Sequence, residues 1–124
     1  MRREDGSGIE RLSSVSQGTM RGSIKSVRVV GSPEVGDTIK LEVVYDASGG
    51  DGGYTIGVVA YDSYTGQLIG FENTTHWSDV IDFSVQFSLT KKMPSEPFDV
   101  SILLYGHPDA WQNIEDYVPS VIPH

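Results

Sequence analysis

Three histidines, His76, His107 and His124, are the side chains best suited to metal binding or proton transfer in this 124-residue chain. None of them stands at the HExxH or HxH spacing that brings two imidazoles to one metal ion. Ser78 and Asp79 follow His76 and supply the residue types of a hydrolytic triad, but no GxSxG nucleophile elbow accompanies them. The chain has no cysteine, which removes thiolate ligands and cysteine nucleophiles. We therefore expect exposed loop histidines, no catalytic residues and no enzymatic activity.

Carboxylates near two predicted loops are the residues that could bind calcium. Asp46 and Asp51 flank the glycine-rich segment DASGGDGG, while Asp109, Glu115 and Asp116 fall between residues 107 and 116. Calcium takes six to eight oxygen ligands, largely from carboxylates and backbone carbonyls. Neither group follows a DxDxDG pattern. The sequence therefore favours solvated turn residues and no cofactor, with calcium as the alternative.

Four aromatic residues fall outside the regular alternation of the sequence: Tyr61, Tyr64, Trp77 and Trp111. Exposed tyrosine and tryptophan rings stack on sugars or anchor protein interfaces. A loop tryptophan also folds back to cover one end of a sandwich, and this structural role is the favoured interpretation for each. Tyr64, Trp77 and Trp111 are retained as the candidate contacts to a ligand or a partner.

Alternation of apolar and polar residues predicts the strands that must position these side chains. In the run 38–46, Ile39, Leu41, Val43 and Tyr45 share one face, which we expect to be buried. Short turns rich in glycine and proline separate the runs, and residues 107–116 are expected to form a loop. The predicted strands are 24–30, 38–46, 54–62, 67–73, 80–90, 98–106 and 117–122.

Five of these runs have a particular place in the expected fold. The run 80–90 puts five apolar residues on one face: Ile81, Phe83, Val85, Phe87 and Leu89. The run 98–106 is more apolar, which favours a central strand. Runs 54–62 and 67–73 are joined by a short turn containing Gly66 and predict a β-hairpin. Pro119 favours an edge position for the last strand.

About seven strands in some 100 residues, joined by short connections, predict an all-β, antiparallel sandwich. Residues 1–22 are polar and mixed in charge, and we expect them to form a flexible N-terminal arm. The sandwich domain is then expected over residues 23–124.

Charge and hydropathy limit the partners. The formal net charge of −8 lies in residues 21–124, because the charges of residues 1–20 cancel. An acidic surface repels phosphate backbones and anionic membranes, so nucleic acid is not an expected partner. No signal peptide is recognisable, and no stretch approaches the roughly 18 apolar residues that span a bilayer. Membrane insertion is therefore not expected.

Two segments carry a resemblance to a known group of modules. SPEVGDTIKLEV (32–43) and AYDSYTGQLIG (60–70) are similar to the first inter-strand corner and the third-to-fourth strand hairpin of immunoglobulin-like and fibronectin type III-like modules in prokaryotic and phage surface proteins. The resemblance covers residues 24–122 and implies a β-sandwich that serves in adhesion, assembly or spacing. It also implies an extracellular or virion-surface location.

Two classes of function follow. The first is a non-catalytic structural or protein-interaction module of a surface, appendage or virion assembly, with other protein chains, including further copies of itself, as partners. The alternative is a carbohydrate-binding module that uses the loop aromatics. Exposed, coplanar aromatic rings on one face or one loop end would distinguish the second class from the first.

Overall fold

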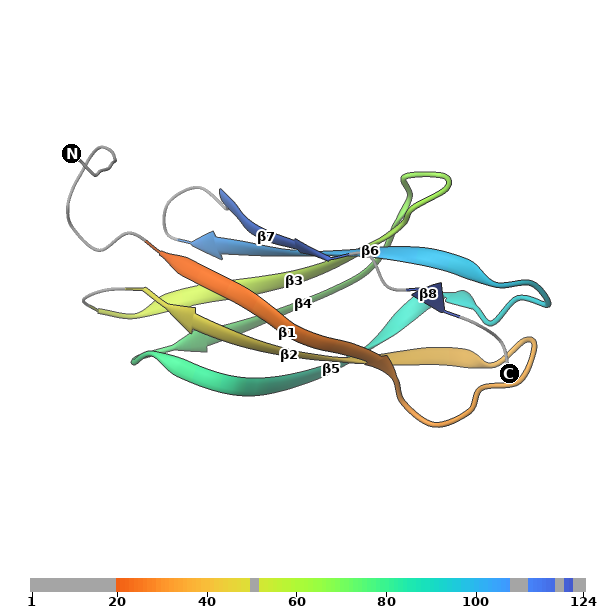
Figure 1. Ribbon diagram of the computed structural model, residues 1–124, viewed down its shortest axis with the longest axis horizontal. Helices are drawn as coiled ribbons and strands as arrows, with labels where there is room; N and C mark the ends of the chain where they lie inside the picture. The colour runs from red at the N-terminus through yellow and green to blue at the C-terminus, as the bar shows by residue number, and fades with distance from the viewer. Residues whose placement is uncertain (1–19, 50–51, 108–111, 118–119, 122–124) are drawn as a thin grey trace.

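The computed structural model describes residues 20–49, 52–107, 112–117 and 120–121, the last two ranges by their backbone alone. Every regular element in the described residues is a β-strand (Figure 1). Six strands have nine or more residues, and two shorter ones follow them. The strands are β1 Arg21–Val29, β2 Thr38–Ser48, β3 Tyr54–Asp62, β4 Leu68–His76, β5 Val80–Lys92, β6 Phe98–His107, β7 Gln112–Tyr117 and β8 Ser120–Val121.

The strands form two antiparallel sheets that pack face to face (Figure 1). The first sheet has the order β1-β2-β5, and the second has the order β4-β3-β6-β7, with β8 pairing with the start of β6. β4 pairs with β3, whereas in antibody constant domains the fourth strand belongs to the other sheet. The predicted all-β, antiparallel sandwich is confirmed, with β6 in an interior position of its sheet.

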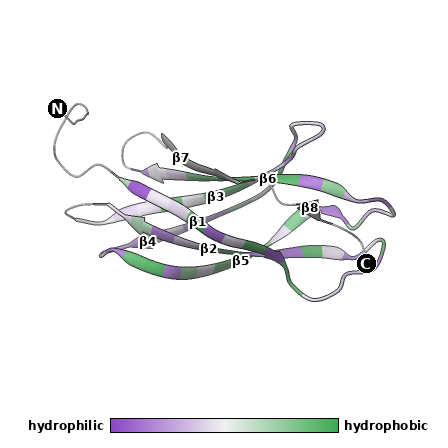
Figure 2. Ribbon diagram, in the orientation of Figure 1, coloured by the Kyte–Doolittle hydropathy of each residue, from purple (hydrophilic) through white to green (hydrophobic). Residues whose placement is uncertain are grey.

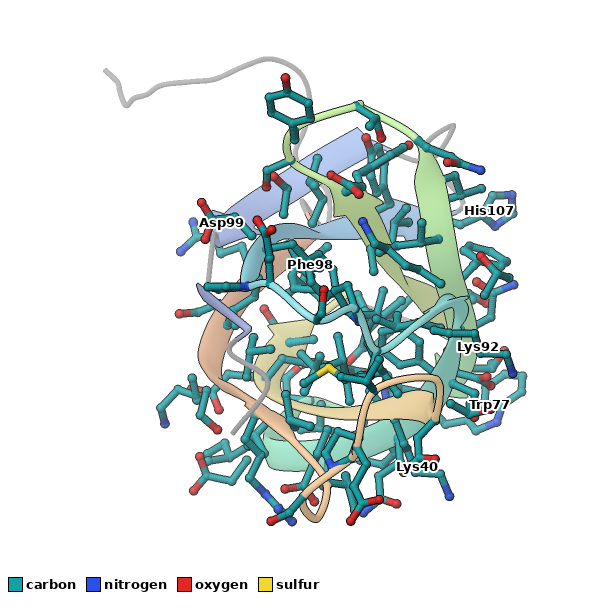
Figure 3. The ribbon with its side chains drawn as sticks, turned by 90° about the vertical axis from the view of Figure 1, so that its right-hand side faces the viewer. Lys40, Trp77, Lys92, Phe98, Asp99 and His107 are labelled. Carbon is teal, nitrogen blue, oxygen red and sulfur yellow. The ribbon has the colours of Figure 1, made fainter. Side chains whose placement is uncertain are left out.

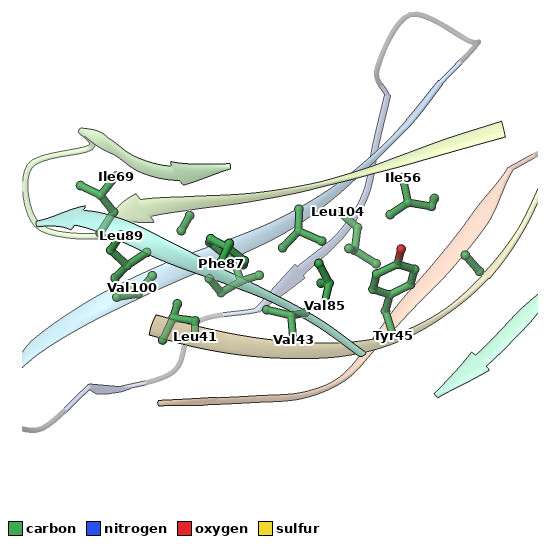
Figure 4. Packing of buried hydrophobic residues seen from close by; sticks show 14 of the residues in the cluster. Leu41, Val43, Tyr45, Ile56, Ile69, Val85, Phe87, Leu89, Val100 and Leu104 are labelled. Carbon is green, nitrogen blue, oxygen red and sulfur yellow. The ribbon is translucent and has the colours of Figure 1, made fainter. Parts of the chain in front are cut away.

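The core lies between the sheets and follows the predicted alternation (Figures 2 and 4). Ile39, Leu41, Val43 and Tyr45 of β2 all point inward and are fully buried. Ile56, Val58 and Ala60 of β3 face them, together with Val100, Ile102 and Leu104 of β6. Side chains two residues apart share a face of a strand, so each central strand presents three or four apolar groups to the opposite sheet.

One residue of the fifth predicted strand faces away from the core. Phe83 packs against the core and Val85, Phe87 and Leu89 are buried, as predicted, but Ile81 is 77% exposed. The pairing with β2 steps from Tyr45↔Phe83 to Ala47↔Val80, so β5 carries one extra residue at this point. Asp82 adopts a positive φ of 54° within this bulge. The bulge turns Val80 toward the core and Ile81 toward solvent, and the predicted inward position of Ile81 is therefore wrong.

The region after β6 also differs from its prediction. Residues 107–116 were expected to form a loop, but β7 begins at Gln112 and pairs with Ile102–Gly106 of β6. The single strand predicted over 117–122 is replaced by the end of β7 and the two residues of β8. The sequence QNIEDY is polar and has little apolar alternation, so hydropathy alone does not indicate a strand here. β7 instead joins the end of the sheet through backbone pairing with β6. Six long strands are thus present rather than seven.

The predicted β3–β4 hairpin is confirmed. Gly66 closes its turn with a positive φ of 76°, a conformation that glycine adopts without steric cost.

The N-terminal boundary of the sandwich lies close to its predicted position. β1 begins at Arg21, two residues before the expected start of the domain. Met20 is buried against Gly106, where an added Cβ would lie 2.6 Å from the Met20 Cε. Residues 1–19 of the expected arm lie outside the described residues.

Candidate binding face on the second sheet

The outward side chains of β4, β3 and β6 form a regular array on the second sheet. Residues that pair across the three strands lie in rows, and successive rows on one face are two residues, about 7 Å, apart. The rows change in character along the strands, from threonine and histidine side chains at one end to mainly aliphatic and aromatic side chains toward the other. In order they are Thr75–Thr55–His107, Asn73–Gly57–Tyr105, Phe71–Val59–Leu103 and Leu68–Tyr61–Ser101.

Five of these residues line a groove of about 360 Å³, and we call them the apolar face: Val59, Tyr61, Leu68, Phe71 and Tyr105. Val59 is almost fully covered, whereas Leu68 and Phe71 on the edge strand are 51% and 52% exposed. A well-packed core already lies on the opposite side of the same strands. The exposed apolar groups of this face therefore add little to folding, and such patches commonly mark contact surfaces.

The outer surface of the first sheet has the opposite chemistry. The Lys25 Nζ lies 2.9 Å from Asp82 Oδ1 and 3.5 Å from Asp46 Oδ2. Arg28 pairs with Glu42, and Glu42 also accepts a hydrogen bond of 2.7 Å from the Ser84 hydroxyl. These groups come from all three strands, so they link the sheet across its outer surface.

A third cluster holds the turn of the β3–β4 hairpin. Asp62 is buried, and its Oδ2 lies 2.6 Å from the Lys91 Nζ. Its Oδ1 accepts hydrogen bonds from the backbone N–H groups of Tyr64 and Thr65. The Lys91 ammonium, and to a lesser degree these two N–H groups, hold the pKa of the Asp62 carboxyl below its usual range. Lys91 also lies 4.4 Å from the centre of the Phe98 ring, so this cluster is a structural clamp on the turn.

His76 occupies a buried position, and the expectation of an exposed loop residue is wrong for it. It is the last residue of β4 and is only 5% exposed. The Tyr45 hydroxyl lies 2.7 Å from its Nε2, and the rings of Tyr54 and Phe83 pack around it. β4 continues three residues beyond the predicted end at residue 73, which places His76 on the inward face. Burial lowers the pKa of His76, so the neutral imidazole is the form that the aromatic cluster accommodates.

The other two histidines have different placements. His107 is the exposed last residue of β6, a strand position rather than the expected loop position, while His124 lies outside the described residues. Ser78 uses its carbonyl to accept a hydrogen bond from the Tyr54 hydroxyl. His76 binds Tyr45 rather than a serine hydroxyl, and this geometry does not form a hydrolytic triad.

The two aromatic candidates that the structure describes do not form one site. Tyr64, 95% exposed, lies in the β3–β4 turn, and Trp77, 80% exposed, lies just after β4. The nine residues of β4 separate them, which corresponds to about 30 Å. Figure 3 views the molecule from the Phe98 end, and Trp77 projects from the same side as His107. Trp111 lies outside the described residues.

Neither described candidate folds back over the core, so the favoured lid role is wrong for both. Tyr64 is held in its turn by the Asp62 clamp, which leaves its ring in solvent. The Trp77 indole instead rests on Gly53, where an added Cβ would lie 2.4 Å from its Cζ3. The glycine thus seats one side of the ring while most of the side chain stays exposed.

Of the carboxylates that the sequence offered for calcium, Asp46 alone has a side chain within the described residues. Asp46 is paired with Lys25 and accepts a hydrogen bond from the backbone N–H of Asp82. Asp51 and Asp109 lie outside the described residues, as do the side chains of Glu115 and Asp116. Among the described side chains, no group of three or more His, Asp or Glu residues could hold a metal ion.

The sequence interpretation missed the apolar face. Its signal was present in the runs YTIGVVAYD and FDVSILLYG, which carry apolar residues at outward as well as inward positions. Such runs are typical of interior strands covered on both sides. β3 and β6 are interior strands, but β4 carries the same outward pattern at the edge.

Comparisons with known proteins place the fold. No family model matches the sequence, and no curated protein sequence matches it either. Two crystal structures of a glycosyl hydrolase family 2 member from Bacteroides cellulosilyticus are similar in structure, with TM-scores of 0.55 and 0.59 and 10% sequence identity. They cover 77% and 83% of this chain, which spans only 14% of each of theirs. At this identity the similarity shows a shared β-sandwich fold. Within the described part of the chain, no helix combines the length and apolar character needed to cross a membrane.

Proposed function

We propose that this chain is a non-catalytic binding module that acts through the apolar face of its second sheet, within a larger protein or assembly. The observation that carries the proposal is the groove formed by five apolar side chains on the outer side of a sheet whose inner side already holds the core. An accessory role is supported by the structural neighbours, because this chain corresponds to 14% of each glycosyl hydrolase chain. The described residues offer no catalytic arrangement: the buried Asp62 is neutralised by Lys91, and His76 is held by Tyr45.

One class of occupant for this face is a protein partner, which includes a second copy of the chain. Aromatic and aliphatic groups at the centre of a contact surface contribute most of the binding free energy in protein interfaces. The mixture of Leu68, Phe71 and Tyr61 fits this chemistry. A protein partner on this face would imply that the chain belongs to a surface, appendage or virion assembly and has a role in adhesion.

A ligand-independent experiment tests whether the apolar face is an accessible binding surface. The full-length chain is titrated with 8-anilinonaphthalene-1-sulfonate, a dye that fluoresces on exposed apolar surfaces. We expect fluorescence from the native protein that falls by more than half in Phe71→Ser, while Ile81→Ser retains it. Ile81 is the matched control because it is a large exposed apolar residue of the first sheet. Equal fluorescence in both variants would exclude the apolar face as the binding surface.

Catalysis is tested separately with a panel of 4-nitrophenyl glycosides. We expect no release of nitrophenol above the rate in buffer. Hydrolysis that disappears in Asp79→Asn, which removes an exposed carboxylate from the β4–β5 turn, would contradict the non-catalytic assignment.

A further inference from the structure

The apolar face and the rows around it have a chemistry that selects among ligands. Building on the proposed function, we propose that the ligand of the second sheet is a neutral carbohydrate chain, which lies along the strand direction across the rows of β4, β3 and β6. Four features of these rows lead to this assignment: their lack of charge, their ring and hydroxyl groups, their dimensions, and the position of Trp77.

The rows are uncharged on an acidic molecule. The chain carries a net charge of −8, yet the four rows contain no Asp, Glu, Lys or Arg. The charged residues of β3, β4 and β6, which are Asp62, Glu72 and Asp99, lie outside these rows. The charged side chains on the outer surface of the first sheet pair with one another. An anionic ligand would be repelled by the molecule as a whole, and a cationic one would find no carboxylate in the rows. A neutral ligand meets neither difficulty.

The rows combine stacking surfaces with hydrogen-bonding groups. Phe71, Tyr61 and Tyr105 supply aromatic rings from three different strands. A pyranose ring has an apolar C–H face, which packs on an aromatic ring, and a rim of hydroxyls, which needs donors and acceptors. Asn73 supplies an exposed amide in the row next to Phe71. The hydroxyls of Thr55 and Thr75, 3.0 Å apart, continue the polar groups toward the end of the strands.

The dimensions favour a carbohydrate chain over a protein surface. Three strands present a strip about 10 Å wide, and four rows extend over about 20 Å. A stable protein interface covers about 800 Å² on each partner, several times the area of this strip. The groove volume of about 360 Å³ lies instead in the range of small-ligand sites.

Trp77 lies at the threonine end of the rows. It follows β4 directly, two residues after Thr75, and its indole is seated on Gly53 with most of its surface exposed. A seated ring loses little conformational freedom when a sugar stacks on it. A carbohydrate chain long enough to cover all four rows would therefore also reach the Trp77 indole, whereas a short oligosaccharide bound at Phe71 would not.

Native affinity electrophoresis of the full-length chain tests this inference. The gels contain hydroxyethylcellulose, xylan or galactomannan as neutral probes, and alginate as an anionic probe. We expect at least one neutral polysaccharide to retard the protein and alginate to leave it unaffected. Retardation by alginate alone would overturn the proposal, as would no retardation in any gel.

Variants locate the site by isothermal titration calorimetry with the hexasaccharide of the retarding polymer. Phe71→Ala should weaken binding about three- to ten-fold, the worth of one aromatic contact, while Ile81→Ala should leave it unchanged. Trp77→Ala should weaken binding of the hexasaccharide but not of the disaccharide. Equal affinity for the native chain and Phe71→Ala would overturn the proposal, and loss of binding in Tyr64→Ala alone would move the site to the hairpin turn.

The outcomes separate this inference from the proposed function. If the dye experiment succeeds and no polysaccharide binds, the apolar face remains a binding surface but its ligand is not a carbohydrate. In that case a solution mass that rises with concentration and returns to the monomer in Phe71→Glu would identify a second copy as the occupant. If the dye experiment itself fails, both proposals fall.

Discussion

The two outer surfaces of this sandwich are built by the same alternation but differ in chemistry. On the first sheet the outward positions carry ion pairs and hydroxyls, such as Lys25–Asp82 and Arg28–Glu42, which link neighbouring strands. On the second sheet they carry the apolar face and the uncharged rows beside it. Both sheets bury an apolar inner side in one common core.

The two surfaces differ in how they meet solvent. The charged groups of the first sheet keep one surface well solvated and satisfy one another at short distance. The second sheet places half-exposed Phe71 and Leu68 on an edge strand, where natural proteins commonly use charges to prevent unwanted contacts. Glu72 is the single Asp, Glu, Lys or Arg residue of β4, so the outward side of this edge carries no such charge. Four predictions test the contrast between the two surfaces, from the largest effect to the smallest.

The largest effect is expected in the core that the two sheets share. Phe87 of β5 lies under β4, where its ring would be 2.8 Å from a Cβ added to Gly70. Phe87→Ala should lower the free energy of unfolding by about 3–5 kcal/mol, because it removes a buried aromatic ring and leaves a cavity. Urea titration measures this loss, and Ile81→Ala, at an exposed position of the same strand, should change it by less than about 0.5 kcal/mol. A cost below about 1 kcal/mol for Phe87→Ala would show that β5 and β4 are not packed as described.

Acid should weaken the end of the sandwich that contains His76. Because burial lowers the pKa of His76 in the folded state, the unfolded chain binds more protons once the pH falls below the ordinary value of 6.5. The stability is therefore complete above about pH 6.5 and is lost as the pH falls, with a slope of at most about 1.4 kcal/mol per pH unit. Urea titrations between about pH 5 and 7 measure this slope. His76→Gln should abolish it and His107→Gln should not; the opposite pattern would contradict the buried placement of His76.

A smaller effect is expected on the charged surface. The Ser84 hydroxyl, followed by the Arg28 guanidinium, holds the pKa of the Glu42 carboxyl below its usual range. Glu42→Gln should give a modest loss of thermal stability at low salt, and the loss should shrink at 1 M NaCl, where charges are screened within about 3 Å. Thermal melts at the two salt concentrations measure it. An equal loss at both would mean that the contribution of Glu42 is not electrostatic.

The smallest effect on stability is expected at the apolar face. Phe71→Ser should change the free energy of unfolding by no more than about 0.5 kcal/mol, because the side chain is half exposed and lies outside the core. The same substitution is expected to weaken carbohydrate binding, so its effects on stability and on binding should differ. A loss above about 2 kcal/mol would show that Phe71 has a structural role instead.

Most of the sandwich could be predicted from the sequence because local patterns indicate its strands and turns. The inward set of β2 follows from alternation and the β3–β4 hairpin from turn chemistry at Gly66, while the interior position of β6 follows from its more continuous apolar run. The exposed position of Ile81 could not be predicted, because the bulge depends on the pairing of β5 with β2. β7 was missed for a similar reason: its polar residues take part in the sheet through backbone pairing with β6.

The candidate site was harder to predict than the fold. Tyr64 and Trp77 were singled out because they lie in predicted loops, but β4 separates them. The residues of the apolar face are adjacent only because β4 and β6 pair with opposite edges of β3. Their proximity is a property of strand order and register, which local periodicity does not encode.

The most direct test of the central claim is a backbone amide chemical-shift titration of the full-length chain with cellohexaose, xylohexaose and mannohexaose in turn. At least one of them should shift amides in 55–61, 68–75 and 101–107 and leave those of β1, β2 and most of β5 unchanged. Phe71→Ala should reduce these shifts at equal ligand concentration. Shifts concentrated on the first sheet, or no shifts with any of the three sugars, would contradict a carbohydrate site on the second sheet.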